Sequence, residues 1–182
     1  MRWDVIRSEI IYRCRIFGVR RDQSRSQGTG QVHDFHVLEV SDFVNVVPLT
    51  SDDQVVMVRQ FRHGIRDLTL EVPAGLVDDT DAAPADAALR ELREETGYQG
   101  QRAVPLGVVH PNPAIMNNRC HIFAAYGVEK VGAPQWDATE ELAVETVPLA
   151  QVPDLIRDGS ISNALTVVAF HLLALTRSEG GA

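Results

Sequence analysis

The chain is poor in cysteine, contains no long hydrophobic run and does not begin with an apolar leader. Cys14 and Cys120 are its only cysteines and form no C-x-x-C pair, which argues against a zinc site and against a disulfide framework. The longest apolar stretch, 164–175, is interrupted by Thr166 and His171 and is too short to span a bilayer. The first residues lack the apolar run of a signal peptide. We therefore expect a cytoplasmic protein without a membrane segment.

Positive charge is also scarce, with 17 Lys and Arg residues against 25 Asp and Glu residues and a formal net charge of -8. An acidic protein of this kind repels polyanions, so we expect neither a nucleic-acid partner nor an anionic membrane as partner. A length of 182 residues suits one domain with a sizeable core, or one domain with a small extension. The hydrophobic content of 45% is ordinary for a globular protein.

The most informative segment reads RELREETGY at positions 90–98. On a helix, Glu91, Glu94 and Glu95 fall within about 100° of one another and form one acidic face. Like charges at this spacing cost roughly a few tenths of a kcal/mol, and a hard divalent cation such as Mg²⁺ would offset that cost. The same spacing is typical of an ordinary amphipathic helix with a solvated acidic face. Spacing alone leaves both interpretations open.

Periodicity and turn residues predict the coarse secondary structure. Pro84 suits the first turn of the acidic helix, and Gly97 suits its end. Two further helices are expected near the C-terminus, at 150–157 and 163–177, the second with Ser162 or Asn163 as its N-cap. Strands enclosing helices indicate an α/β sandwich. Runs rich in β-branched and aromatic residues, separated by turn signals, predict strands at 10–19, 32–40, 43–49, 54–61, 68–72, 104–109, 120–128 and 142–147, with a polar hairpin loop at 20–30.

A longer pattern surrounds the acidic segment. Gly75 is followed by Asp81 and then by Arg-Glu-Leu-x-Glu-Glu-x-Gly-Tyr, beginning at Arg90. This pattern resembles the Nudix box of the Nudix hydrolases, and it specifies too many positions over too short a span for a chance match. The family has a glutamate where Asp81 stands and an arginine one position closer to the glycine. This chain therefore carries an extra residue within 82–86.

The resemblance implies a fold and a domain organisation. Nudix domains are α/β/α sandwiches with a mixed β-sheet, and such a domain would cover residues 42–178. A strand-rich N-terminal extension would occupy residues 1–41. Extensions of this kind often build a homodimer in the family, so the resemblance also implies a homodimer.

The resemblance further implies a metal site. The second, third and fourth glutamates of the box bind metals in the family, and they correspond here to Glu91, Glu94 and Glu95. The main-chain carbonyl oxygen of Ala74 would supply another ligand. The implied cofactor is Mg²⁺, for which Mn²⁺ can substitute. Arg90 would pair with these carboxylates and orient them.

Hydrolysis also needs a general base that accepts a proton from the attacking water. In the branch of the family that cleaves nucleotide sugars, this base is often a glutamate on a loop well after the box. Glu140 is the first candidate and Glu141 the second, because both precede an apolar strand in the corresponding place. A solvated loop would carry the same residues, and Glu94 could serve as the base instead.

Two further segments indicate the substrate class. The segment VRQFRH followed by LEVPAG resembles the QFR…E-x-PAG pattern of ADP-ribose and other nucleoside-diphosphate-sugar pyrophosphatases. Arg59, Arg62 and Glu71 in these segments are the candidate substrate-binding residues. Ala114 is another, because its loop, HPNPAIMNN, resembles the substrate-facing loop after the box. That loop departs from the S-P-G form that is commoner among ADP-ribose enzymes.

The predicted activity is therefore Mg²⁺-dependent hydrolysis of the pyrophosphate bond of nucleoside-diphosphate sugars. ADP-ribose is the first candidate substrate, giving AMP and ribose 5-phosphate, and GDP-mannose or an ADP-hexose comes next. A Nudix hydrolase of nucleoside triphosphates is an alternative enzyme. The alternative from another class is a non-catalytic sensor that binds a nucleotide sugar and regulates a partner.

Overall fold

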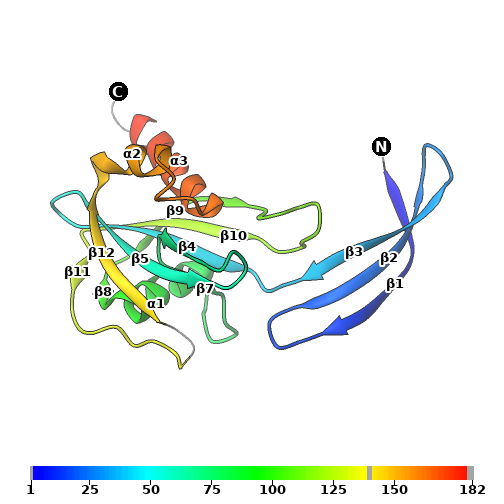
Figure 1. Cartoon of the computed structure of the whole chain (residues 1–182), viewed down its shortest axis with the longest axis horizontal. Coiled ribbons are helices and arrows are strands. Elements are labelled where there is room, and N and C mark those ends of the chain that lie inside the picture. The colour runs from blue at the N-terminus through cyan, green and yellow to red at the C-terminus, as the bar shows by residue number, and fades with distance from the viewer. Residues whose placement is uncertain (1, 139–140, 180–182) are drawn as a thin grey trace. The chain divides into compact units, whose positions relative to one another are not determined.

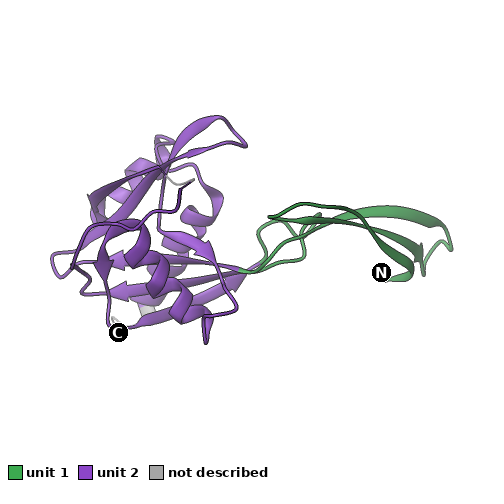
Figure 2. Cartoon of the chain, turned by 90° about the horizontal axis from the view of Figure 1, so that it is seen from below, with its two compact units in different colours: residues 1–42, 110–119 green, residues 43–109, 120–182 purple. Residues whose placement is uncertain are grey.

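The computed structural model describes residues 2–138 and 141–179, and the chain forms two compact units (Figure 2). Unit 1 comprises Met1–Asp42 and His110–Arg119, and unit 2 comprises Phe43–Val109 and Cys120–Ala182. Among the described residues, no helix is both long and apolar enough to cross a membrane.

Unit 1 is built on a three-stranded antiparallel sheet of β1 (Trp3–Arg13), β2 (Gly18–Ser26) and β3 (Val32–Glu39), in the order β1-β2-β3. Most of the polar stretch 20–30 is thus strand, and the prediction of a hairpin loop there was wrong. Buried and exposed residues alternate along the second half of β2, but the buried ones are polar. Asp22 and Ser24 are buried, and Asp22 accepts hydrogen bonds from Arg20 and Ser8.

The segment 110–119 also belongs to unit 1, although the sequence analysis placed it within the domain at 42–178. It runs beside the end of β3. The Leu38 main-chain N–H donates to the Ile115 carbonyl oxygen at 2.7 Å, and the Asn117 N–H donates to the Leu38 carbonyl oxygen at 3.3 Å. The Val40 N–H donates to Asn117 Oδ1 at 3.1 Å. These bonds tie the segment to residues far away in the sequence.

Unit 2 contains a seven-stranded mixed sheet in the order β12-β5-β4-β10-β9, with β6 paired to β5 and β7 paired to β4. The pair β4 and β10 is parallel and the other pairs are antiparallel. The mixed α/β fold predicted from the sequence is thereby confirmed. The strands are β4 (Phe43–Leu49), β5 (Gln54–Arg62), β6 (Asp67–Glu71), β7 (Ala74–Leu76), β9 (Ala103–Val109), β10 (Cys120–Tyr126) and β12 (Leu142–Pro148), and a separate two-stranded pair consists of β8 (Tyr98–Gln99) and β11 (Glu129–Lys130).

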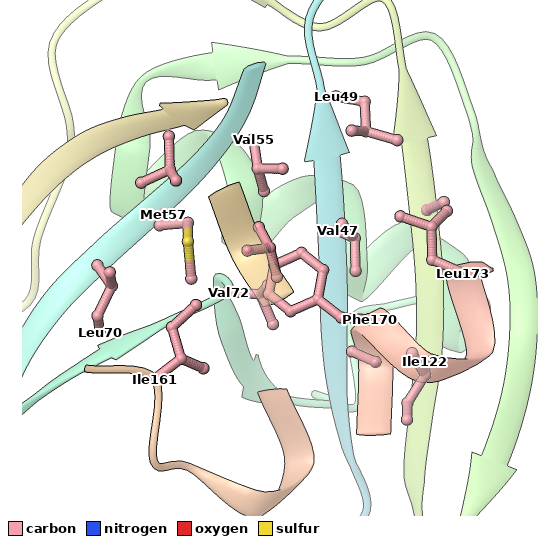
Figure 3. Packing of buried hydrophobic residues seen from close by; sticks show 14 of the residues in the cluster. Val47, Leu49, Val55, Met57, Leu70, Val72, Ile122, Ile161, Phe170 and Leu173 are labelled. Atoms are coloured by element: carbon pink, nitrogen blue, oxygen red, sulfur yellow. The ribbon is translucent and has the colours of Figure 1, made fainter. Parts of the chain in front are cut away.

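Helices cover both faces of this sheet (Figure 1). Helix α1 (Pro84–Thr96) packs on one face, and α2 (Val152–Arg157) and α3 (Ala164–Glu179) cover the other. Adjacent residues of β4 therefore enter different cores. Val46 packs on the side of α1, whereas Val47 packs with Met57 and Phe170 on the side of α3 (Figure 3). Because both faces are covered, β4 reads as a nearly continuous apolar run.

The ends of the helices agree with the sequence signals. Pro84 stands in the first turn of α1, and Gly97 ends the helix in the left-handed region at φ 74°. A Cβ atom at Gly97 would lie 2.3 Å from the Gly132 carbonyl oxygen, so only glycine fits there. Asn163 is the N-cap of α3, because its Oδ1 accepts the main-chain N–H groups of Leu165 and Thr166 at 2.9 and 3.1 Å.

Candidate active site

The glycine of the box motif lies against the acidic helix. Gly75 is in β7, which pairs with the beginning of β4, and α1 packs against both strands. A Cβ atom built on Gly75 would lie 2.0 Å from the carboxyl carbon of Glu91. The Glu91 carboxylate therefore occupies the space that any other residue at position 75 would need. The fold thus explains why this position is glycine.

The other two glutamates of the acidic face differ in exposure. Glu95 is only 4% exposed, and its Oε2 accepts the main-chain N–H of Ala74 at 3.2 Å. Glu94 is more open, with 41% of its side chain exposed. Gly75 and Ala74 thus meet Glu91 and Glu95 at one place, where β7 runs beside α1. Two of the three predicted carboxylates of the helix therefore lie beside Ala74 and Gly75.

Arg90 connects the acidic residues of the site. Its Nη1 donates to Glu91 Oε1 at 2.7 Å and to Glu94 Oε2 at 3.0 Å, while Nη2 donates to the Leu76 carbonyl oxygen at 3.0 Å. Its Nε and Nη2 also donate to the two carboxylate oxygens of Asp81, at 3.1 and 2.9 Å. These bonds, those to Asp81 first, raise the pKa of Arg90, and Arg90 in turn lowers the pKa of Asp81.

Asp81 explains how the chain accommodates its departure from the box pattern. Its side chain is 5% exposed and bonds to Arg90 through both oxygens. Its Oδ2 also accepts the main-chain N–H of Asp78 at 2.9 Å, which closes a turn just before the stretch 82–86 that carries the extra residue. The shorter acid therefore still reaches the arginine, although the spacing between Gly75 and Arg90 is longer by one residue.

The donor chemistry of the site fits a hard divalent cation, because carboxylate and main-chain carbonyl oxygens are the ligands that such ions select. Among residues 2–138 and 141–179, however, no three His, Cys, Asp or Glu side chains are gathered so that they could hold a metal ion as they stand. Arg90 engages one oxygen of Glu91 and one of Glu94. A cation bound by these glutamates would therefore share their carboxylates with Arg90.

Two predicted substrate-binding residues, Arg62 and Glu71, form a pair next to the box. Arg62 Nε donates to Glu71 Oε1 at 2.8 Å, and Nη2 donates to Oε2 at 2.7 Å. Both residues line a cavity of about 320 Å³ together with Ala74 and Gly75. The bonds to Glu71 raise the pKa of Arg62, and the charge of Glu95 acts in the same direction. The guanidinium group is therefore within electrostatic reach of the acidic helix.

The remaining predicted residues lie elsewhere or outside the described chain. Arg59 donates from Nε and Nη2 to the Glu145 carboxylate at 2.6 and 3.1 Å, which clamps β5 to β12. Ala114 belongs to unit 1. Glu141 is exposed just before β12, and Glu140 lies outside the described residues.

Two hydrogen bonds that the sequence did not predict involve main-chain carbonyl groups at the C-terminal end of α1. The last carbonyl groups of a helix have no partner within the helix. Here the Gln135 main-chain N–H donates to the Glu94 carbonyl oxygen at 2.7 Å, and the Trp136 indole Nε1 donates to the Glu95 carbonyl oxygen at 2.9 Å. No local sequence signal could reveal this, because Trp136 and Glu95 are 41 positions apart. Gln135 and Trp136 are thereby fixed to the end of the acidic helix.

Comparison with known proteins agrees with the fold. The NUDIX domain family matches residues 42–165. The chain is 31% identical over 166 residues to the ADP-ribose pyrophosphatase of Mycobacterium tuberculosis (strain ATCC 25618 / H37Rv), covering 91% of this chain and 80% of that protein. It is 28% identical over 171 residues to the methanol dehydrogenase activator of Bacillus methanolicus, covering 93% and 91%.

The likeness extends to a solved structure. A crystal structure of an ADP compounds hydrolase superposes with a TM-score of 0.86 at 24% identity, covering 100% of this chain and 97% of that one, which shows a shared fold. The box motif, the mixed sheet between helices and the family match define a single class of enzyme. The chain belongs to the Nudix family and is a Nudix hydrolase.

Proposed function

We propose that the protein hydrolyses the pyrophosphate bond of nucleoside-diphosphate sugars with the help of Mg²⁺, and that ADP-ribose is its main substrate. The observation that carries this proposal is the arrangement of Glu91 and Glu95 against Ala74 and Gly75, beside the cavity that Arg62 lines. The products would be AMP and ribose 5-phosphate. The name of the M. tuberculosis relative, ADP-ribose pyrophosphatase, supports the choice of substrate.

Different residues of the site would bind the metal, bind the substrate and accept the proton. Glu91, Glu94, Glu95 and the Ala74 carbonyl oxygen would hold the metal, which when bound neutralises phosphate oxygens and favours ionisation of a water molecule. Arg62 would bind a phosphate oxygen of the substrate, because a guanidinium group offers several N–H donors in one plane. A glutamate then accepts the proton of the water that attacks one phosphorus atom in line.

The identity of this base gives a testable prediction. We expect Glu140→Gln and Glu141→Gln to differ sharply, with only one of them lowering kcat by about 10² or more, because amide side chains do not accept the proton. Steady-state kinetics of both variants at saturating Mg²⁺ would show which residue acts. Equal and near-normal turnover of both variants would assign the role to another residue, with Glu94 as the next candidate.

The first experiment on the function is product analysis by chromatography. Purified protein would be incubated with ADP-ribose, GDP-mannose, ADP-glucose and a nucleoside triphosphate, each with Mg²⁺, with Mn²⁺ and with a chelator. We expect metal-dependent release of AMP from ADP-ribose at the highest kcat/KM of the set. Preference for another diphosphate sugar would change the substrate within the class. Binding of ADP-ribose without turnover would instead favour the non-catalytic sensor.

We also propose that unit 1 mediates a homodimer. Its sheet exposes many large apolar side chains, and a soluble protein rarely leaves such a surface uncovered. Sedimentation equilibrium would test this proposal by measuring the molecular mass in solution. A monomeric mass at micromolar concentration would rule out the dimer. The exposed residues include Trp3, Val5, Ile6, Ile10, Ile11 and Tyr12.

A further inference from the structure

Asn45 is a polar residue in the middle of the buried, otherwise apolar strand β4. It is 3% exposed. Because side chains alternate along a strand, Asn45 lies on the same face of β4 as Phe43 and Val47, which pack in the core on the side of α3. Burial of an amide group costs free energy unless the group is hydrogen-bonded. The hydrogen-bond partners of the Asn45 side chain therefore need to be identified.

The oxygen end of the Asn45 amide has a partner in the protein. Cys120, on the neighbouring strand β10, donates from Sγ to Asn45 Oδ1 at 3.5 Å. Burial raises the pKa of the Cys120 thiol to about 12, so the thiol keeps its proton and remains a donor. This contact assigns Oδ1 to the core. The other end of the amide is the Nδ2 group, which carries two N–H donors.

The Nδ2 group of Asn45 is accessible from the cavity of about 320 Å³ that Asn45 lines together with Arg62 and Ala74. Ala74 is directly opposite Asn45 in the pairing of β7 with β4. In the described part of the chain, the buried side-chain polar atom without a partner is Asn118 Oδ1, so the Asn45 nitrogen is not enclosed in the core. Its N–H groups are therefore available to a molecule that enters the cavity.

The donors of this cavity differ in charge and in exposure. The Arg62 side chain is 42% exposed, whereas Asn45 is 3% exposed and carries no charge. A phosphate group loses more hydration free energy at a buried neutral site than an uncharged sugar does. The exposed donor thus suits a phosphate oxygen, and the buried donor suits a hydroxyl oxygen of a sugar.

We propose that Asn45 is a substrate-binding residue, which donates from Nδ2 to a sugar hydroxyl oxygen of the diphosphate substrate at the buried end of the cavity. This inference rests on the proposed function, because it takes Arg62 as the phosphate contact in the same cavity. It goes further by assigning a residue to the sugar. An asparagine kept only for its bond to Cys120 would affect stability and leave the KM for the substrate unchanged.

The first test removes the amide with two substitutions of different size, Asn45→Ala and Asn45→Val. We expect each variant to raise the KM for ADP-ribose about three- to tenfold, because one hydrogen bond to the substrate is lost. The kcat should change less than about threefold, because the contact is made to a part of the substrate that does not react. Asn45→Val should not lower the Tm, because valine suits a strand and buries no polar group.

The matched control is Val47→Ala, two positions along the same face of β4. Val47 is fully buried and packs in the core instead of lining the cavity. Its truncation should lower the Tm and leave the KM at the wild-type value, which is the opposite of the pattern expected for Asn45→Val. A wild-type KM in both Asn45 variants would overturn the proposal.

A second measurement identifies the group that Asn45 contacts. The KM of the wild-type protein and of Asn45→Val would be compared for a series of ADP-ribose analogues, each lacking one sugar hydroxyl. We expect the two KM values to coincide for the analogue that lacks the contacted hydroxyl and to differ for the others. The same ratio for every analogue would overturn the assignment to a sugar. If wild-type protein neither cleaves nor binds ADP-ribose in calorimetry, the proposed function itself fails, and this inference with it.

Discussion

The substitution Glu95→Gln is expected to lower kcat by at least about a hundredfold while leaving the fold intact. Loss of several kcal/mol of charge stabilisation by the metal site corresponds to an effect of this size. Glu95 is the most deeply buried of the described carboxylates on the acidic face, and its Oε2 accepts the Ala74 main-chain N–H. A glutamine keeps the shape and can still accept that hydrogen bond, so stability is expected to change little.

The matched control is Glu129→Gln, which makes the same chemical change at an exposed position on β11. It should leave kcat, KM and Mg²⁺ dependence at wild-type values. Thermal unfolding of both variants, followed by circular dichroism, would establish that they are folded. Near-normal turnover of Glu95→Gln at saturating Mg²⁺ would refute the assignment of Glu95 to the metal site.

The substitution Gly75→Ala is expected to cost roughly a hundredfold in kcat/KM and to raise the Mg²⁺ concentration needed for half-maximal activity. The new Cβ atom would lie 2.0 Å from the Glu91 carboxyl carbon, so the Glu91 side chain must move away. A misplacement of about 1 Å at a catalytic site can cost on the order of a hundredfold. The fold should survive, because the displaced group is the end of a flexible side chain.

Gly132→Ala is the control for this glycine substitution, since a Cβ atom at position 132 would meet nothing within 4 Å. Its activity and its Mg²⁺ titration should match those of the wild-type protein. If Gly75→Ala had the same Mg²⁺ titration as the wild type, the position of Glu91 would not matter for metal binding. That result would leave Gly75 with a role only in the packing of β7 against α1.

The part of the fold that the sequence predicts well rests on local signals. The limits of α1 follow from Pro84 and Gly97, and the range 43–49 predicted for a strand coincides with β4. Hydrophobic periodicity did not predict β2, because polar residues such as Asp22 occupy buried positions of this strand. It also failed for β7, because the short segment Ala74–Leu76 is a strand only through its pairing with β4.

The sequence by itself determined the family, the acidic face of α1 and the glycine that precedes it, because a helical repeat and a spaced motif are properties of neighbouring residues. Only the tertiary structure decided which of these groups are buried and which partners they have. Arg62 and Glu71 meet across the paired strands β5 and β6, although the register places Asp67 opposite Arg62 and Val58 opposite Glu71. Asn163 caps α3, 92 positions beyond Glu71, and lines the same cavity. Such contacts depend on the register of the sheet and on the packing of distant segments, neither of which is encoded in a local pattern.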